Sequence, residues 1–109
     1  MRALVKRLVE DQSFEGRDEL LAQVPFVRVA DGPLTFLALD VDRSAVPASL
    51  FVRGHVPGCA WVRDAYGEPL GTLAVWVDRG YLSALEYGWV TGEAPAELPG
   101  LDQIYYESV

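Results

Sequence analysis

Two short stretches at the start of the chain carry apolar residues at helical spacing. In residues 2–11 the apolar positions recur at i, i+1, i+4 and i+5, which places them on one stripe of a helix. We predict a second helix over residues 16–24, with Asp18 and Glu19 in its first turn, where the helix dipole favours negative charge. Pro25 disfavours helical geometry at Val24 and is expected to end this helix.

After Pro25 the apolar period changes from that of a helix to that of a strand. Residues 25–41 alternate as two strands around the turn Asp31-Gly32-Pro33. The pattern of residues 42–58 is weaker and leaves three interpretations open: one helical turn, one short strand near residues 50–53, or neither.

Three strand-like runs follow, and they predict an antiparallel meander over residues 59–90. The runs are "CAWVRD", "LGTLAVWVD" and "YLSALEYGWV". We predict that Asp78-Arg79-Gly80 forms a three-residue hairpin loop with a bulge, in which Gly80 takes the left-handed conformation. The remaining tail contains Pro95 and Pro99 and is expected to be mostly irregular, with a final short strand in "QIYYE".

These elements together predict a single α+β domain spanning residues 1–109. Two short N-terminal helices are expected to pack on one face of a five- to six-stranded antiparallel sheet. A half-open barrel with helices filling its mouth is the alternative architecture. The length is close to the commonest domain size, and half of the residues are apolar, which suffices for a core.

The last run of the meander carries an unusual number of aromatic residues, and its alternation defines two faces. One face would hold five residues, namely Tyr81, Ser83, Leu85, Tyr87 and Trp89. The other would hold Leu82, Ala84, Glu86, Gly88 and Val90. The alternation leaves open which of the two faces the core.

The charge balance limits the kinds of partner. Nine basic residues stand against 16 acidic ones, a net charge of −7, which opposes binding to nucleic acid or to an anionic membrane. Residues 80–109 contain five acidic residues and no basic one, so most of the net charge lies in the last part of the chain. An acidic segment that also bears aromatic rings suits a basic protein partner.

From this segment we predict a non-catalytic protein-binding surface. Large aromatic rings dominate the energetic centres of protein interfaces, and carboxylates steer basic partners towards them. The predicted partner-binding residues are Glu86, Tyr87, Trp89, Glu93 and Glu97. A small-molecule pocket lined by Trp61, Trp76 and Tyr81 is the alternative function.

Residue types suited to catalysis are few. His55 and Cys59 are single, and their spacing across Pro57 and Gly58 matches no nucleophile motif. Zinc needs three or four nitrogen or sulfur ligands, and only these two are present. A carboxylate pair of Glu86 with Asp78 or Glu93 has no spacing that brings the two together. We therefore predict no enzyme activity, no metal and no cofactor, while an enzyme using Cys59 or Glu86 remains a third hypothesis.

The predicted location is the cytoplasm. The single cysteine excludes an internal disulfide bond, as is usual in a reducing compartment. The opening residues "MRALVKRLVEDQ" are interrupted by Lys6 and Arg7 and lack the apolar core of a signal peptide.

The run "LAVWVDRGYLSALEY" followed by "EAPAELP" resembles a C-terminal hairpin found in a loose set of small acidic α+β bacterial proteins of unknown function. The shared positions are Gly80, Leu82, Leu85, Glu86, Pro95, Leu98 and Pro99. The stretch "FEGRDELLAQV" is similar to their short early helix, and one lysine against eight arginines is typical of an actinobacterial source. By size and charge the chain also resembles immunity proteins, which plug the basic active site of a toxin. This resemblance implies an immunity-like or regulatory role.

Overall fold

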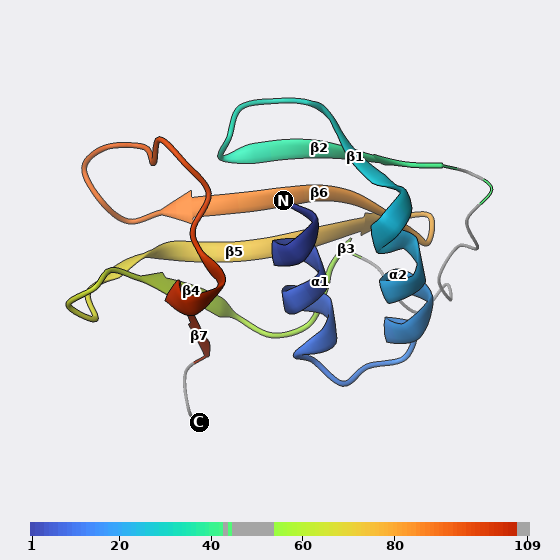
Figure 1. The fold of residues 1–109 in the computed structure, drawn as a ribbon, viewed down its shortest axis with the longest axis horizontal. Helices are drawn as coiled ribbons and strands as arrows, with labels where there is room; N and C mark the ends of the chain where they lie inside the picture. Colours follow the sequence, from blue (N-terminus) through green and yellow to red (C-terminus); the bar gives the residue numbers. More distant parts are fainter. Residues whose placement is uncertain (43, 45–53, 107–109) are drawn as a thin grey trace.

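The protein is an α+β domain in which helices cover one face of an open sheet (Figure 1). The computed structural model describes residues 1–42, 44 and 54–106. Helices α1 (Arg2–Glu10) and α2 (Arg17–Gln23) come first, and the 3-10 turn η1 (Val24–Phe26) leads into the sheet. The strands are β1 (Val27–Asp31), β2 (Phe36–Val41), β3 (Gly54–His55), β4 (Ala60–Arg63), β5 (Pro69–Asp78), β6 (Tyr81–Trp89) and β7 (Ile104–Tyr106), with the turn η2 (Leu101–Gln103) before β7.

All described strand pairs are antiparallel, in the order β1-β2-β6-β5-β4-β7, and β3 adds to β5. The two predicted helices, the strand pair around Gly32, the meander and the final short strand are confirmed. Among the described residues the sheet has seven strands, because the two-residue β3 adds to the predicted set. Its path runs between the two edge strands β1 and β7, so the described strands do not close into a barrel. The open interpretations near residues 50–53 lie outside the described residues.

The hairpin between β5 and β6 differs in detail from the prediction. Asp78 pairs with Tyr81, so the loop contains two residues, Arg79 and Gly80, and not three. Both have positive φ, 53° and 83°, which a two-residue loop of type I′ requires. The left-handed Gly80 is thus confirmed, and the predicted loop length is wrong.

The irregularity of this hairpin lies inside β6 and changes which residues face the core. Trp76 pairs with Ala84 and Val77 with Leu82, so Ser83 is an extra residue without a partner across the ladder. Because of this bulge, Leu82 and Leu85 are both buried although they are three positions apart. The two unbroken faces expected for residues 81–90 therefore do not run through the whole strand.

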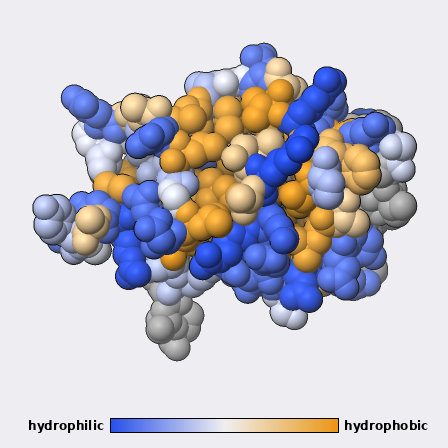
Figure 2. Space-filling view, in the orientation of Figure 1, coloured by the Kyte–Doolittle hydropathy of each residue, from blue (hydrophilic) through white to orange (hydrophobic). Residues whose placement is uncertain are grey.

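The core lies between the sheet and the helices. The stripe of α1, namely Leu4, Val5, Leu8 and Val9, is buried against the same face of the sheet as Leu73, Val75 and Val77 of β5. Residues 98–103 cross the sheet on this side too, beside α1 (Figure 1). On this helix side, apolar atoms remain visible over β2 and between the helices (Figure 2), and Val29 on the edge strand β1 is 45% exposed.

One polar side chain, Gln23 at the end of α2, is fully buried in this core. Its Nε2 donates a hydrogen bond to the carbonyl oxygen of Gly80 at 2.8 Å, and its Oε1 accepts one from the backbone N–H of Leu82 at 3.0 Å. The amide side chain therefore supplies both a donor and an acceptor to the β5–β6 turn and fixes that turn against α2.

A second polar contact joins the two ends of the described chain. The hydroxyl group of Tyr106 donates to Asp11 Oδ2 at 3.0 Å, and the same oxygen accepts from Arg7 Nε at 2.6 Å. Burial, and then the hydrogen bond to Asp11, raise the pKa of Tyr106 from 10.0 to about 12. This contact holds β7 against the end of α1.

We expect the Tyr106 contact to make the stability fall at high pH. A tyrosine pKa raised by folding stabilises the protein fully below about pH 10 and loses this contribution as the pH rises to about 12. The free energy of unfolding in urea should therefore fall more steeply over this range in the wild type than in Tyr106→Phe. Tyr66→Phe, at a 91% exposed side chain, is the control and should follow the wild type. Equal slopes for Tyr106→Phe and the wild type would contradict the prediction.

Candidate functional site

The candidate site is the face of the sheet opposite the helices, called here the helix-free face. The described helices and residues 98–103 all lie on the other side of the sheet (Figure 1). Side chains alternate along a strand, so residues between the buried ones point to the helix-free face. In β2, for example, Leu37, Leu39 and Val41 are buried in the core, and Phe36 and Ala38 therefore point the other way.

Aromatic rings stand around the middle of the helix-free face. Trp61 pairs with Tyr105 on β7, and the guanidinium of Arg63 lies 5.3 Å from the centre of the Tyr105 ring. Further along the same edge of β5, Trp76 pairs with His55 on β3, and the two rings meet edge to face with centroids 5.5 Å apart. These contacts fix the orientation of the rings.

Small residues form the floor between these rings. Ala38, Ala84 and Trp76 lie in one cross-strand row, and Gly88, Thr72 and Trp61 lie in another. Ala74 lies between Thr72 and Trp76 on β5 and pairs with Glu86. Four residues along β5 correspond to about 13 Å, and the five strands from β2 to β7 span about 19 Å. The size of this floor suits one extended or helical segment.

Glu86 is the charged residue at the centre of this floor. It lies on β6 between Phe36 of β2 and Ala74 of β5, and its Oε1 accepts a hydrogen bond from Trp76 Nε1 at 3.1 Å. Phe36 is 45% exposed. A carboxylate thus lies between two aromatic rings, with one oxygen held in place by an indole N–H.

The described cations of the helix-free face already contact other side chains. Arg28 donates to Asp40 Oδ2 at 2.9 Å from the edge strand β1, and Arg63 lies over Tyr105 near the opposite edge. Among the ion pairs of the described residues, none includes Glu86. The carboxylate therefore adds a negative charge to the centre of an aromatic surface.

The five residues predicted to bind a partner do not form one surface. Glu86 is on the helix-free face, whereas Tyr87 points into the core and is only 4% exposed. Trp89, at the end of β6, is 43% exposed. Glu93 and Glu97 are exposed in the loop that continues from Trp89 past the end of the sheet. Tyr87 therefore offers no ring to a partner, because the sheet and the helix side enclose it.

The burial of Tyr87 has a local cause in β5. A Cβ atom placed on Gly71 would lie 2.8 Å from Cε1 of the Tyr87 ring, so the missing side chain provides the space that the ring fills. Burial also raises the pKa of Tyr87. Trp61 and Trp76 belong to the pocket predicted as the alternative function, and Phe36 has no predicted role. Their alternation with buried residues in β2, β4 and β5 is the signal that places all three on the helix-free face.

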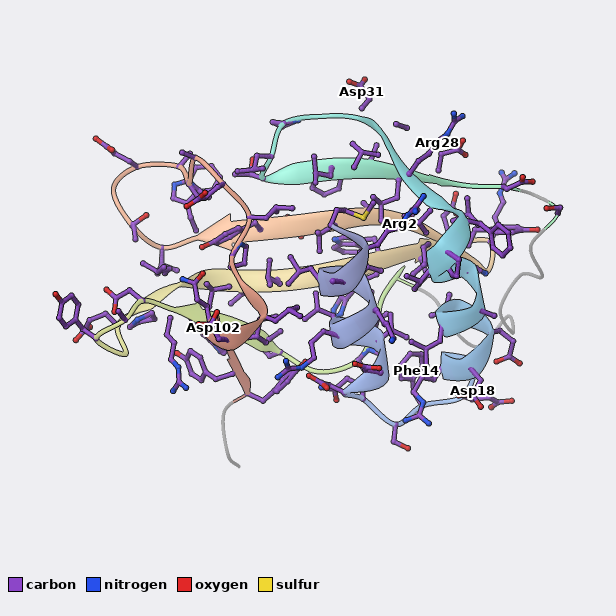
Figure 3. The ribbon with its side chains drawn as sticks, viewed as in Figure 1. Arg2, Phe14, Asp18, Arg28, Asp31 and Asp102 are labelled. Atoms are coloured by element: carbon purple, nitrogen blue, oxygen red, sulfur yellow. The ribbon has the colours of Figure 1, made fainter. Side chains whose placement is uncertain are left out.

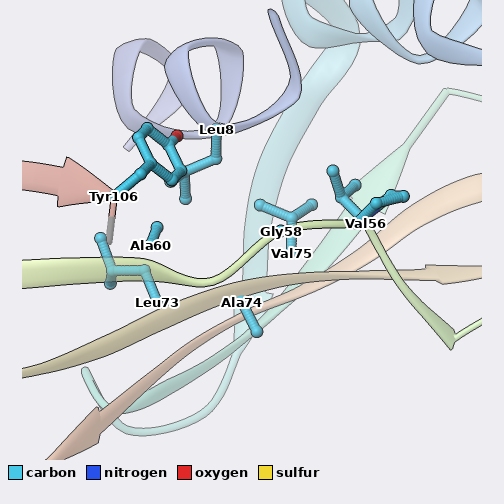
Figure 4. A pocket seen from close by; sticks show the side chains of 9 residues that line it. Leu8, Val56, Gly58, Ala60, Leu73, Ala74, Val75 and Tyr106 are labelled. Atoms are coloured by element: carbon cyan, nitrogen blue, oxygen red, sulfur yellow. The ribbon is translucent and has the colours of Figure 1, made fainter. Parts of the chain in front are cut away.

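The space between α1, β5 and β7 is too small for a ligand. A cavity of about 10 Å³ lies between Leu8 of α1, Leu73 of β5 and Tyr106 of β7 (Figure 4). A cavity of this size holds at most one water molecule.

Two larger depressions open to the surface and are mostly polar or charged. One of about 550 Å³ is lined by residues that include Arg63, Asp64 and Asp102. The other, of about 370 Å³, lies near Arg2 and Arg28, whose positions around β1 are seen in Figure 3. Trp61, Trp76 and Tyr81 line none of these three cavities. The small-molecule alternative gains no support from them.

The described contacts of His55 do not bring it to Cys59. The ring of His55 packs on Trp76, and its Nδ1 is 2.9 Å from the carbonyl oxygen of Val56, while Cys59 is exposed. Within residues 1–42, 44 and 54–106, no three His, Cys, Asp or Glu side chains cluster in a way that could hold a metal ion. No helix in this part of the chain is long and apolar enough to cross a membrane.

A scan against protein-family models, a search of curated proteins and a search of solved structures each found no match.

Proposed function

We propose that this protein is a non-catalytic binding module that docks a basic protein partner on its helix-free face. The observation that carries the proposal is the position of Glu86, a carboxylate held by Trp76 at the centre of an aromatic sheet face. Aromatic rings provide large contact areas at low entropic cost, and a central charge selects the partner. Occupying a basic site of the partner would give the module an immunity-like or regulatory role.

The charge of the face favours a basic partner over a second copy of the chain. In a symmetric dimer the same patch meets itself, so two Glu86 carboxylates on the central strand β6 would approach each other in a desolvated layer. Each copy also carries a net charge of −7. Both effects oppose self-association, whereas a partner with exposed Arg or Lys residues would be attracted.

Photo-cross-linking tests where the partner docks. Phe36→p-benzoylphenylalanine places a cross-linker on the helix-free face, and Tyr66→p-benzoylphenylalanine places one on an exposed ring in the β4–β5 loop. In the source cells we expect position 36 to cross-link to one dominant partner, a protein of positive net charge. Position 66 should not give this adduct. If the dominant adduct joins two copies of the chain, this face mediates self-association and not binding to a basic partner. That result would overturn the proposal.

The purified complex then gives a quantitative test. Thr72→Lys adds a cation to the floor of the helix-free face and should weaken binding to the cross-linked partner by at least about tenfold, or about 1.4 kcal/mol, in titration calorimetry. The control Glu97→Lys changes the net charge by more than Thr72→Lys does, but it lies in the loop past the end of β6. It should mainly slow association. A Thr72→Lys affinity equal to that of the wild type would show that the partner docks elsewhere.

A further inference from the structure

We infer that Glu86, Trp76 and Phe36 together form a receptor for one arginine side chain of the partner. This inference rests on the proposed function and identifies the group that the helix-free face recognises. It is drawn from three contacts: the pairing of Glu86 with Phe36, the hydrogen bond from Trp76 Nε1 to Glu86 Oε1, and the packing of His55 on Trp76.

A planar cation bound beside Glu86 can make two kinds of contact: hydrogen bonds to the carboxylate and packing on an aromatic ring. The hydrogen bond from Trp76 fixes the carboxylate at 3.1 Å, and this carboxylate has further acceptor sites for N–H donors. The rings of Trp76 and Phe36 stand on either side of Glu86, on the neighbouring strands β5 and β2. A guanidinium group can therefore donate to Glu86 while it packs on an aromatic ring.

The surroundings favour arginine over lysine. Arginine is more weakly hydrated than lysine, it stacks on aromatic rings, and its donors form a planar fork that matches a carboxylate. Glu86 is partly buried, so a cation that binds there must lose part of its water. Ala38, Ala74 and Ala84 keep the floor around the site low, which leaves room for the long side chain to lie along the sheet.

Matched peptides test the receptor without knowledge of the partner. The probes are three blocked peptides of the form Gly-Val-Xaa-Val-Gly, in which Xaa is arginine, lysine or citrulline. Citrulline keeps the shape of arginine and removes its charge. Each is titrated into ¹⁵N-labelled protein, and the indole Nε1–H signal of Trp76 is followed. Among the three tryptophans, this signal is assigned by its loss in Trp76→Phe.

We expect the arginine peptide to move the Trp76 indole signal in a saturable manner. Lysine should bind at least about threefold more weakly than arginine, and citrulline at least about tenfold more weakly. Glu86→Gln should abolish the difference between arginine and citrulline. Glu97→Gln is the matched control, because it removes one carboxylate from the loop past β6, and it should leave all three titrations unchanged.

The outcomes separate this inference from the proposed function. Equal binding of arginine and citrulline would overturn recognition of a cation, and equal binding of arginine and lysine would overturn the preference for a guanidinium. The amide spectrum of Glu86→Gln verifies that the variant is folded. If Glu86→Gln binds the cross-linked partner like the wild type while Thr72→Lys does not, the arginine receptor is wrong and the docking face stands. If Thr72→Lys also binds like the wild type, the docking face itself is wrong.

Discussion

Replacing Gln23 by alanine is expected to lower the free energy of unfolding by about 3 kcal/mol. The side chain is fully buried and bonds the carbonyl oxygen of Gly80 and the N–H of Leu82. Alanine leaves both backbone groups without these bonds in the core and also leaves a cavity. Each buried polar group that loses its partner costs about 1–3 kcal/mol.

Urea denaturation of three variants separates the causes of this loss. Gln23→Leu fills the space but cannot form the two hydrogen bonds, so it should recover only the part of the loss that comes from the cavity. Ala22→Gln changes an exposed neighbour on α2 and should stay within about 0.5 kcal/mol of the wild type. A loss below about 1 kcal/mol for Gln23→Ala would show that the turn does not depend on this side chain.

Gly71→Ala is expected to destabilise the protein by about 2–3 kcal/mol. The new Cβ would lie 2.4 Å from the carbonyl oxygen of Gly88 and 2.8 Å from Cε1 of Tyr87. Contacts this close to the backbone of β6 require that strand to move, and the Tyr87 ring has to leave its position. We therefore also expect the pKa of Tyr87 to fall towards its ordinary value, because burial is what raises it.

Thermal unfolding and a tyrosine titration followed by ultraviolet absorbance would measure these two effects. Gly92→Ala is the matched control, because a Cβ atom at this position meets no atom within 4 Å. It should leave both the stability and the titration unchanged. A stable Gly71→Ala variant with an unchanged Tyr87 pKa would mean that the packing of Tyr87 against β5 has been wrongly assigned.

The expected binding residues show how far the sequence alone could lead. The charge of Glu86 predicts a binding role, and the structure surrounds this residue with rings that come from other strands: Phe36 from β2 and Trp76 from β5. The ring of Tyr87 predicts the same role, but that ring is buried over Gly71. Composition indicates which side chains are suited to binding. It does not indicate which of them the core uses.

The sequence by itself determined the elements of this protein. Apolar spacing defines the helices and strands, and turn residues such as Gly32 and Gly80 separate them, because both signals depend on neighbours within a few residues. Only the tertiary structure decided which faces are free. The bulge at Ser83, the space above Gly71 and the crossing of residues 98–103 depend on contacts between distant segments. A shift of one residue in a strand exchanges its inner and outer side chains, so the exposed face follows from pairing and not from alternation alone.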